Sequence, residues 1–221
     1  MLKSLRPWMG LLLSAGLWTG CTVLVDPGHV PKPDLTVDLA DPVLNRRRVF
    51  VVGTLTSASA AETVRQLLHL DAQSSEPIDL FLMTPGGDLK AAFAVEHAFQ
   101  MIRSKVNTVA LGECNSGGAV LLAAGTGERR AFPDSVIVVH GMVPKNHPPA
   151  RYTELTQEAY TDFWHRCARL PESWLPLPQG RVFVLSAREA LEYGLIDRIE
   201  ARPDGTNAVP SATSPETSAG R

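Results

Sequence analysis

Short apolar runs, often rich in β-branched residues, alternate along the middle of the chain with segments whose apolar residues recur every three or four positions. The apolar runs predict buried strands at residues 49–55, 78–83, 106–111, 135–139 and 181–185. The helical spacing predicts helices at residues 61–70, 89–102, 118–124, 151–169 and 186–193. Strands that alternate with helices indicate an α/β fold with a largely parallel sheet flanked by helices.

Serines precede the first and the last of these helices. Ser57 or Ser59 is expected to cap the first helix and Ser186 the last, because a serine oxygen accepts hydrogen bonds from the free N–H groups of a first helical turn. Gly194 is expected to end the last helix.

The N-terminal residues have the pattern of an export signal. Lys3 and Arg6 precede an apolar segment at residues 8–18, and small residues follow it. This segment is shorter than the roughly 20 residues that a membrane-spanning helix needs. We therefore interpret residues 1–20 as a signal peptide that is cleaved.

Three further regions differ in composition. Residues 21–45 contain several prolines and aspartates without lasting periodicity, which predicts an extended tether. Residues 202–221 are rich in small and polar residues and predict a disordered tail. The folded domain is expected to span residues 46–201.

Thr-Gly-Cys follows the apolar segment directly and resembles a bacterial lipobox, which would make Cys21 the lipidated first residue of the mature chain. Trp18 departs from that pattern, which prefers Leu, Val or Ile there. Simple secretion and an uncleaved anchor are the alternatives. Acyl chains on Cys21 would hold the domain at a membrane, so we expect an exported protein on the periplasmic face of the bacterial cell envelope.

Composition limits the classes of partner. The 221 residues are 44% hydrophobic and 20% charged, with a net charge of -2, so no basic excess points to nucleic acid. No Cys/His cluster has metal-ligand spacing, His165 is read as a surface residue, and we expect neither a metal nor a cofactor. Cys114 and Cys167 could form a disulfide in an exported protein, or remain two separate buried thiols.

Three predicted strands end in residues that suit acyl transfer. Ser116 lies among glycines where a strand passes into a helix, although small residues at such a turn can also serve packing alone. His140 ends another strand and could take the serine proton near neutral pH. Gly86 and Gly87 follow a third strand, and glycines let backbone N–H groups approach an oxyanion closely.

These motifs, in this order and spacing, resemble the proteolytic subunit of the Clp protease in the ClpP/crotonase superfamily. The resemblance covers about residues 48–199: Thr-Pro-Gly-Gly at 84–87, the serine turn at 112–119, the strand ending in His140, and residues 185–197. It implies a ClpP/crotonase-like fold with a protruding helical handle. It also implies a homo-oligomer that acts on peptides or unfolded proteins.

Position by position, the resemblance implies a nucleophile at Ser116, a general base at His140 and an oxyanion hole from the backbone N–H groups of Gly87 and Gly117. The Ser-Gly-Gly sequence is also close to related signal-peptide-peptidase-like enzymes with a Ser-Lys dyad. Lys145 is thus an alternative base, but those enzymes lack the histidine found here, and we favour His140.

The sequence departs from the family pattern in two places. Val182 stands where the family places the aspartate of its catalytic triad; Asp162, Glu172 or a backbone carbonyl are the substitutes considered. A proline-rich segment at residues 143–149 replaces a glycine-rich strand that pairs with substrate and helps to stack rings. Strand-type substrate pairing and a double-ring chamber are therefore not assumed.

These observations favour an exported serine peptidase of Clp type. Its activity would be independent of ATP, with no ATPase partner, because an ATP-driven unfoldase is not expected outside the cytoplasm. The first alternative, motivated by Val182, is a catalytically weakened or inactive lipoprotein that acts as an assembly or binding module. The second is crotonase-like acyl-CoA chemistry, which export and the Ser116/His140 pair disfavour.

Overall fold

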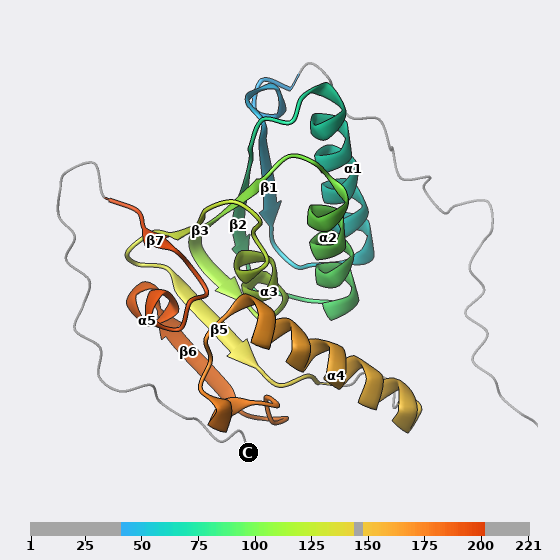
Figure 1. Ribbon diagram of the computed structural model, residues 1–221, viewed down its shortest axis with the longest axis vertical. Helices are drawn as coiled ribbons and strands as arrows, with labels where there is room; N and C mark the ends of the chain where they lie inside the picture. Colours follow the sequence, from blue (N-terminus) through green and yellow to red (C-terminus); the bar gives the residue numbers. More distant parts are fainter. Residues whose placement is uncertain (1–40, 144–147, 202–221) are drawn as a thin grey trace, which may run out of the picture. The chain divides into compact units, whose positions relative to one another are not determined.

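The computed structural model describes residues 41–143 and 148–201 (Figure 1). The strands are β1 (Arg48–Val52), β2 (Ile78–Thr84), β3 (Val106–Asn115), β4 (Arg129–Ala131), β5 (Val136–His140), β6 (Val182–Ser186) and β7 (Arg198–Ile199). The helices are α1 (Ser57–Gln73), α2 (Leu89–Met101), α3 (Gly117–Ala123), α4 (Ala150–Cys167) and α5 (Ala187–Glu192). Two 3-10 turns, η1 (Leu44–Arg46) and η2 (Glu172–Trp174), complete the described elements.

The strands form one mostly parallel sheet. Its main path runs β1-β2-β3-β4-β7, with parallel pairing throughout. β5 pairs in parallel with the C-terminal end of β3, and β6 is antiparallel to β5. This architecture confirms the α/β fold with a largely parallel, helix-flanked sheet that the sequence predicted.

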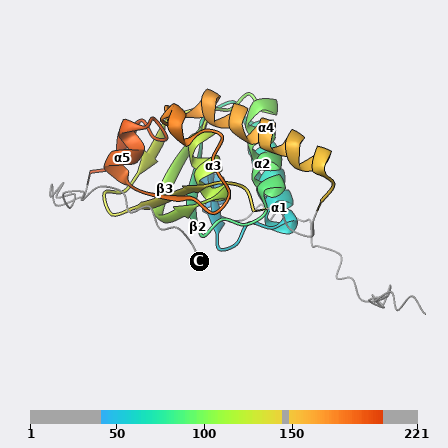
Figure 2. The ribbon, with the colours of Figure 1, turned by 90° about the horizontal axis from the view of Figure 1, so that it is seen from below.

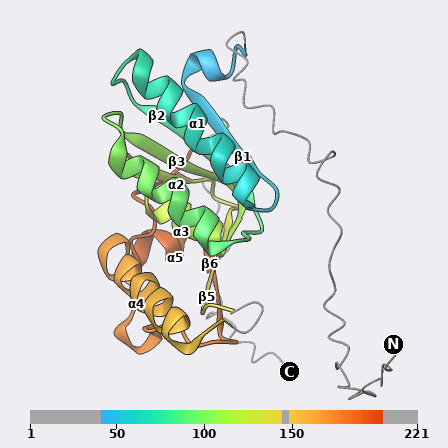
Figure 3. The same ribbon diagram turned by 90° about the vertical axis from the view of Figure 1, so that its right-hand side faces the viewer.

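The helices lie on one side of the sheet, as Figure 2 shows. α1 and α2 run side by side across β1 and β2 (Figure 3). Alternate strand residues such as Val51 and Leu80 point into this layer and are buried against helix residues such as Leu67 and Phe99. Each large side chain buried in this way stabilises the fold by about 1.5–3 kcal/mol.

The other face of β1 and β2 carries exposed apolar side chains. Phe50, Val52 and Met83 are 46%, 59% and 45% exposed, and the ring of Phe50 stacks on that of Phe81 with centroids 4.9 Å apart. Within the described ranges no helix covers these side chains. The patch of Phe50, Val52 and Met83 is called the open face below.

α4 forms the helical handle. Tyr160, Phe163 and Trp164 in its second half are buried, whereas Tyr152 and Leu155 in its first half are 42% and 47% exposed. Edge-to-face contacts between Phe163 and Trp164, with centroids 5.1 Å apart, fix the buried half. The helix is thus anchored at one end and projects at the other.

Several local features differ from the sequence expectation. Thr56, and neither Ser57 nor Ser59, caps α1, because its hydroxyl accepts from the N–H of Ser59 at 3.1 Å. Ser186 caps α5 as predicted, with Glu189 completing the capping box. Strands β4 and β7 were not predicted, since two or three residues carry no measurable periodicity.

The first strand is shorter than its apolar run. β1 ends at Val52 because Gly53, with φ +79°, turns the chain. Leu55 then forms an isolated bridge with Gly87: its N–H donates to the carbonyl of Gly86 at 2.8 Å, and its carbonyl accepts from Asp88 at 3.0 Å. The apolar run therefore forms strand β1 and, at Leu55, two backbone hydrogen bonds that hold the glycine loop after β2.

Leu44 is buried in the core at 5% exposure, inside the range assigned to the tether. The signal peptide, the lipidation residue Cys21 and the disordered tail lie outside the described residues, so these remain predictions. Within the described ranges, no helix is both long enough and apolar enough to cross a membrane.

Candidate active site

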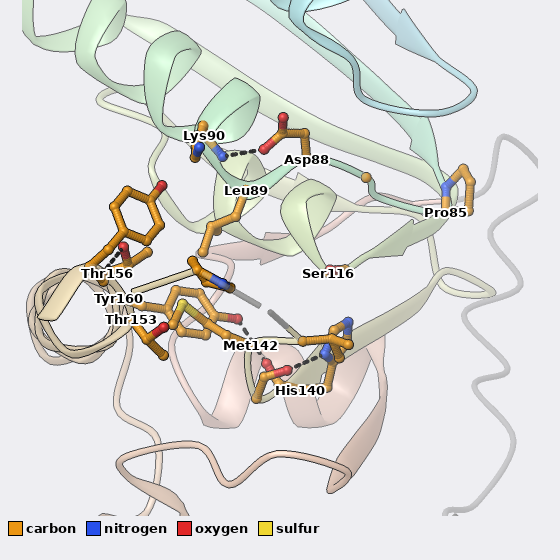
Figure 4. A pocket seen from close by; sticks show the side chains of 15 residues that line it. Pro85, Asp88, Leu89, Lys90, Ser116, His140, Met142, Thr153, Thr156 and Tyr160 are labelled. Carbon is orange, nitrogen blue, oxygen red and sulfur yellow. Dashed lines mark hydrogen bonds between the residues drawn. The ribbon is translucent and has the colours of Figure 1, made fainter. Parts of the chain in front are cut away.

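A cavity of about 510 Å³ opens between the N-terminus of α2, the turn before α3, the end of β5 and the handle helix α4 (Figure 4). Ser116 and His140 both line it. The carboxyl ends of β2, β3 and β5 converge there, which is where parallel sheets commonly place their sites.

Ser116 is held in an unusual backbone conformation. Its φ of 54° and ψ of -116° make it one of two described non-glycine residues with positive φ. Such a conformation costs about 1–3 kcal/mol and persists only where the surroundings enforce it. Here the Ser116 N–H donates to the carbonyl of Val138 at 2.7 Å, which ties the turn to β5. A strained serine between a strand and a helix has the geometry of a nucleophile elbow.

The glycine loop after β2 packs directly against this turn. A Cβ on Gly86 would lie 2.6 Å from the Cβ of Ser116, and φ at Gly86 is +91°. Gly87 has φ +152°, and a Cβ there would lie 2.2 Å from the carbonyl oxygen of Leu55. Both positions therefore require glycine for space and for backbone conformation.

The two amides expected in the oxyanion hole lie next to each other. A Cβ on Gly117 would lie 3.9 Å from the amide nitrogen of Gly87. Neither amide donates a hydrogen bond to any acceptor in the part of the chain that the structure describes. Two free N–H groups beside a strained serine can together stabilise an oxyanion.

His140 occupies the last position of β5, and its ring is held by the backbone. Nδ1 lies 2.7 Å from the carbonyl oxygen of Gly141. A carbonyl can only accept, so Nδ1 carries the proton and Nε2 of the neutral ring is left as the acceptor. The hydroxyl of Tyr160 donates to the carbonyl of His140 at 3.0 Å, and burial raises the pKa of Tyr160 to about 12. This hydroxyl is therefore a permanent donor at neutral pH.

No hydrogen bond joins Ser116 to His140 among the described residues, although both face the same cavity. Catalytic hydrogen bonds are often long in proteins without substrate and shorten on binding. The described state brings the serine and the two amides together and leaves the imidazole apart.

Val182 lies directly opposite His140 in the antiparallel register of β5 and β6. The other carboxylates considered do not line the cavity: Asp162 is exposed on α4, and the carboxylate of Glu172 lies 3.7 Å from Nε2 of His165. The group in contact with Nδ1 of His140 is thus a backbone carbonyl.

Lys90 and Tyr152 form a contact at the cavity that the sequence did not suggest. Nζ of Lys90 lies 5.0 Å from the centroid of the Tyr152 ring, linking α2 to α4. Hydrogen bonding to Lys90 lowers the pKa of Tyr152. No sequence signal relates these residues, because helical periodicity does not reveal which helices meet.

Lys145, the alternative base, lies outside the described residues.

Cys114 and Cys167 are free thiols in this structure. Cys114 is fully buried, and desolvation raises the pKa of its thiol strongly, so it is a packing residue beneath the serine turn. In the described ranges, no group of three or more His, Cys, Asp or Glu side chains could hold a metal ion.

Residues 32–203 match the family model described as Clp protease. The chain belongs to the Clp protease family. The ATP-dependent Clp protease proteolytic subunit of Deinococcus radiodurans is 33% identical over 177 residues, covering 76% of this chain and 87% of that protein. The chloroplastic ATP-dependent Clp protease proteolytic subunit 3 of Arabidopsis thaliana is 32% identical over 189 residues, covering 80% of this chain and 60% of that protein. Proteolytic subunits of this family are serine proteases that bind peptides and generally form homo-oligomers.

Proposed function

We propose that this Clp-family chain is an exported, ATP-independent serine peptidase, with Ser116 as nucleophile, His140 as general base and the amides of Gly87 and Gly117 as oxyanion hole. The observation that carries the proposal is the strained backbone of Ser116 beside two free amides. A protein that used this turn only for packing would gain nothing from a costly conformation at a serine.

The chemistry is acyl transfer in two stages. Nε2 of His140 takes the proton of the Ser116 hydroxyl while the Ser116 oxygen attacks the peptide carbonyl. The imidazolium then protonates the leaving amine, which leaves an acyl-enzyme. Water, activated by the same ring, hydrolyses the acyl-enzyme. The amides of Gly87 and Gly117 bind the oxyanion in both stages, and in such sites each donor contributes about 10²–10³ in rate.

Substrate binding has to bring Ser116 and His140 together before the first stage, since no hydrogen bond joins them in the described state. A peptide in the cavity would pack against the handle helix and the serine turn at once. Apolar lining residues such as Leu89, Met142 and Tyr160 suit a peptide side chain.

The peptidase proposal is tested with an unfolded, fluorescently labelled protein and the purified full chain, with and without ATP. Wild type is expected to cleave it equally well in both conditions, and Ser116→Ala is expected to be inactive. Cleavage that requires ATP and an added unfoldase would contradict ATP independence.

Export and lipidation rest on the sequence of residues 1–21. The test is metabolic labelling with a palmitate analogue in bacteria, followed by fractionation of the cells. We expect wild type to carry label in the membrane fraction and Cys21→Ser to lose it. An unlabelled chain in the cytoplasm would contradict both export and the membrane anchor.

A catalytically inactive assembly or binding module is the second candidate. Val182, and the missing hydrogen bond between Ser116 and His140, favour it. It predicts a folded wild-type chain that cleaves no peptide, whereas Val182→Asp gains activity.

A further inference from the structure

We propose that the backbone carbonyl of Gly141 takes the place of the triad carboxylate, and that close packing at Gly141 and the hydroxyl of Tyr160 position it. This inference rests on the proposed role of His140 as general base. It makes the site a Ser–His dyad with a neutral main-chain orienting group.

The contact itself defines the tautomer. The distance of 2.7 Å between Nδ1 of His140 and the Gly141 oxygen is that of a good hydrogen bond, and only the ring nitrogen can donate. Nε2 is therefore the basic nitrogen. This is the tautomer that a triad carboxylate would select, achieved here without charge.

Packing restricts the position of the carbonyl. A Cβ on Gly141 would lie 2.3 Å from the carbonyl oxygen of Pro178 and 2.6 Å from that of Leu177. Real Cβ atoms do not approach backbone so closely, so only glycine lets the chain after β5 pass against residues 177–178. This close packing of Gly141 against residues 177–178 restricts the position of the Gly141 carbonyl, whose oxygen accepts the hydrogen bond from the His140 ring.

Tyr160 fixes the preceding peptide. Its hydroxyl donates to the His140 carbonyl at 3.0 Å, and its ring meets that of Trp164 edge to face with centroids 5.8 Å apart. Tyr160 is 3% exposed and lies at the wall of the cavity. Tyr160 does not touch the reacting atoms; it is a positioning residue that ties the base to the handle helix.

The neighbouring strand offers no competing acceptor. Val182 faces His140 across the antiparallel pair, where directly opposite Cβ atoms are about 4.5–5.5 Å apart. A carboxylate at 182 would therefore reach the ring. Loss of the carboxylate in a well-studied triad costs about 10⁴ in rate when it also produces the wrong tautomer. Because the carbonyl keeps the correct tautomer, we expect a smaller loss here.

The experiment compares pH profiles of peptide cleavage by the full-length wild type, Val182→Asp and Val184→Asp. Val184 lies on the same strand opposite Val138, so Val184→Asp adds the same charge two pairs along the ladder, on the same face of the sheet. The other charged or titratable groups that line the cavity with His140 are Asp88, Lys90, Tyr152 and Tyr160, and Arg181 precedes Val182 in the chain; all are retained in every variant.

Val182→Asp is expected to raise kcat about tenfold and to move the acidic limb of the profile to higher pH by about one unit, because a carboxylate stabilises the imidazolium. Val184→Asp is expected to have a smaller effect on both. Equal effects of the two variants, or none from Val182→Asp, would overturn the inference.

Rescue gives a second readout. Gly141→Ala should lower kcat at nearly unchanged KM, and the added Val182→Asp should restore most of the loss by supplying another orienting group. Gly112→Ala is the matched control, since a Cβ there meets nothing within 4 Å. A Gly141→Ala protein that folds and keeps full kcat would overturn the proposal.

Nitrogen-15 NMR of the His140 ring in the folded wild type provides a test that needs no activity and no variant to fold. A proton on Nδ1 is expected. A proton on Nε2 in the neutral ring would overturn the inference, whether or not the chain cleaves peptides. Failure of the peptidase proposal would instead appear as absent cleavage with the Nδ1 tautomer intact.

Discussion

Val182 stands directly across from His140 in the antiparallel pair of β5 and β6. The chain has therefore kept the position from which a carboxylate could orient the base, but it carries an apolar side chain there. Nδ1 of His140 is bound instead by the carbonyl of Gly141. The structure brings Ser116 together with the amides of Gly87 and Gly117, and among the described residues no carboxylate contacts the ring of His140.

Gly87→Ala is expected to damage the proposed oxyanion hole. The added Cβ would lie 2.2 Å from the carbonyl oxygen of Leu55 at a φ of +152°, so the loop has to move and take its amide with it. We expect kcat for peptide cleavage to fall about 10²–10³-fold with a smaller change in KM. Gly112→Ala serves as control, and a Gly87→Ala protein of normal kcat would exclude this amide from the oxyanion hole.

Tyr160→Phe is expected to lower both stability and activity. It leaves the His140 carbonyl without its donor, which costs about 1–3 kcal/mol in the free energy of unfolding. Urea unfolding measures this loss, and peptide cleavage under folded conditions measures the change in kcat. Tyr193→Phe is the comparison, because Tyr193 does not line the cavity. A variant with unchanged kcat would show that the hydroxyl does not position the base.

The ion pair that joins β4 to the segment before β7 makes stability depend on pH. Hydrogen bonds from Arg129, one of them 2.6 Å long, hold the pKa of Asp197 below its ordinary value of 3.8. A carboxylate with a lowered folded-state pKa stabilises the fold above its unfolded pKa, and this contribution disappears as pH falls through the folded value.

Asp197→Asn should therefore lower Tm near neutral pH and have a smaller effect at an acidic pH below the ordinary carboxyl value of 3.8. Thermal unfolding followed by circular dichroism measures the difference, with Asp162→Asn, an exposed carboxyl on α4, as control. An equal loss of Tm at both pH values would mean that the amide disturbs packing rather than removing an ion pair.

The open face is expected to support self-association. Three exposed apolar side chains lie together on β1 and β2, and members of this family generally form homo-oligomers. Phe50→Lys should shift sedimentation velocity toward smaller species. Leu68→Lys on α1 is the matched control, because Leu68 is 44% exposed and Phe50 is 46% exposed. Unchanged sedimentation of Phe50→Lys would place the contacts between subunits elsewhere.

The sequence predicted the layers of the fold well because burial imposes periodicity. Every run that became β2, β5 or β6 is apolar at alternate or successive positions, and the long helices show a clear apolar face. Residues such as Gly53 and Thr56 changed the boundaries, since turns and caps depend on single residues and not on a period.

The site was only partly predictable. Ser116 and the glycines could be proposed as site residues because acyl transfer demands particular residue types, and the structure places them side by side. The acceptor for His140 is a main-chain oxygen, which every residue possesses and no side chain reveals. Tyr160 was predicted to lie on an amphipathic helix, but its hydroxyl contact joins positions far apart in sequence.

The proposed peptidase activity requires Ser116 to be an activated nucleophile. Labelling of the folded full-length chain with a fluorophosphonate, followed by peptide mass mapping, tests it most directly. We expect modification at Ser116 in wild type, greatly slowed modification in His140→Ala, and none in Ser116→Ala. A folded wild-type chain that remains unlabelled at Ser116 would mean that Ser116 is not a nucleophile.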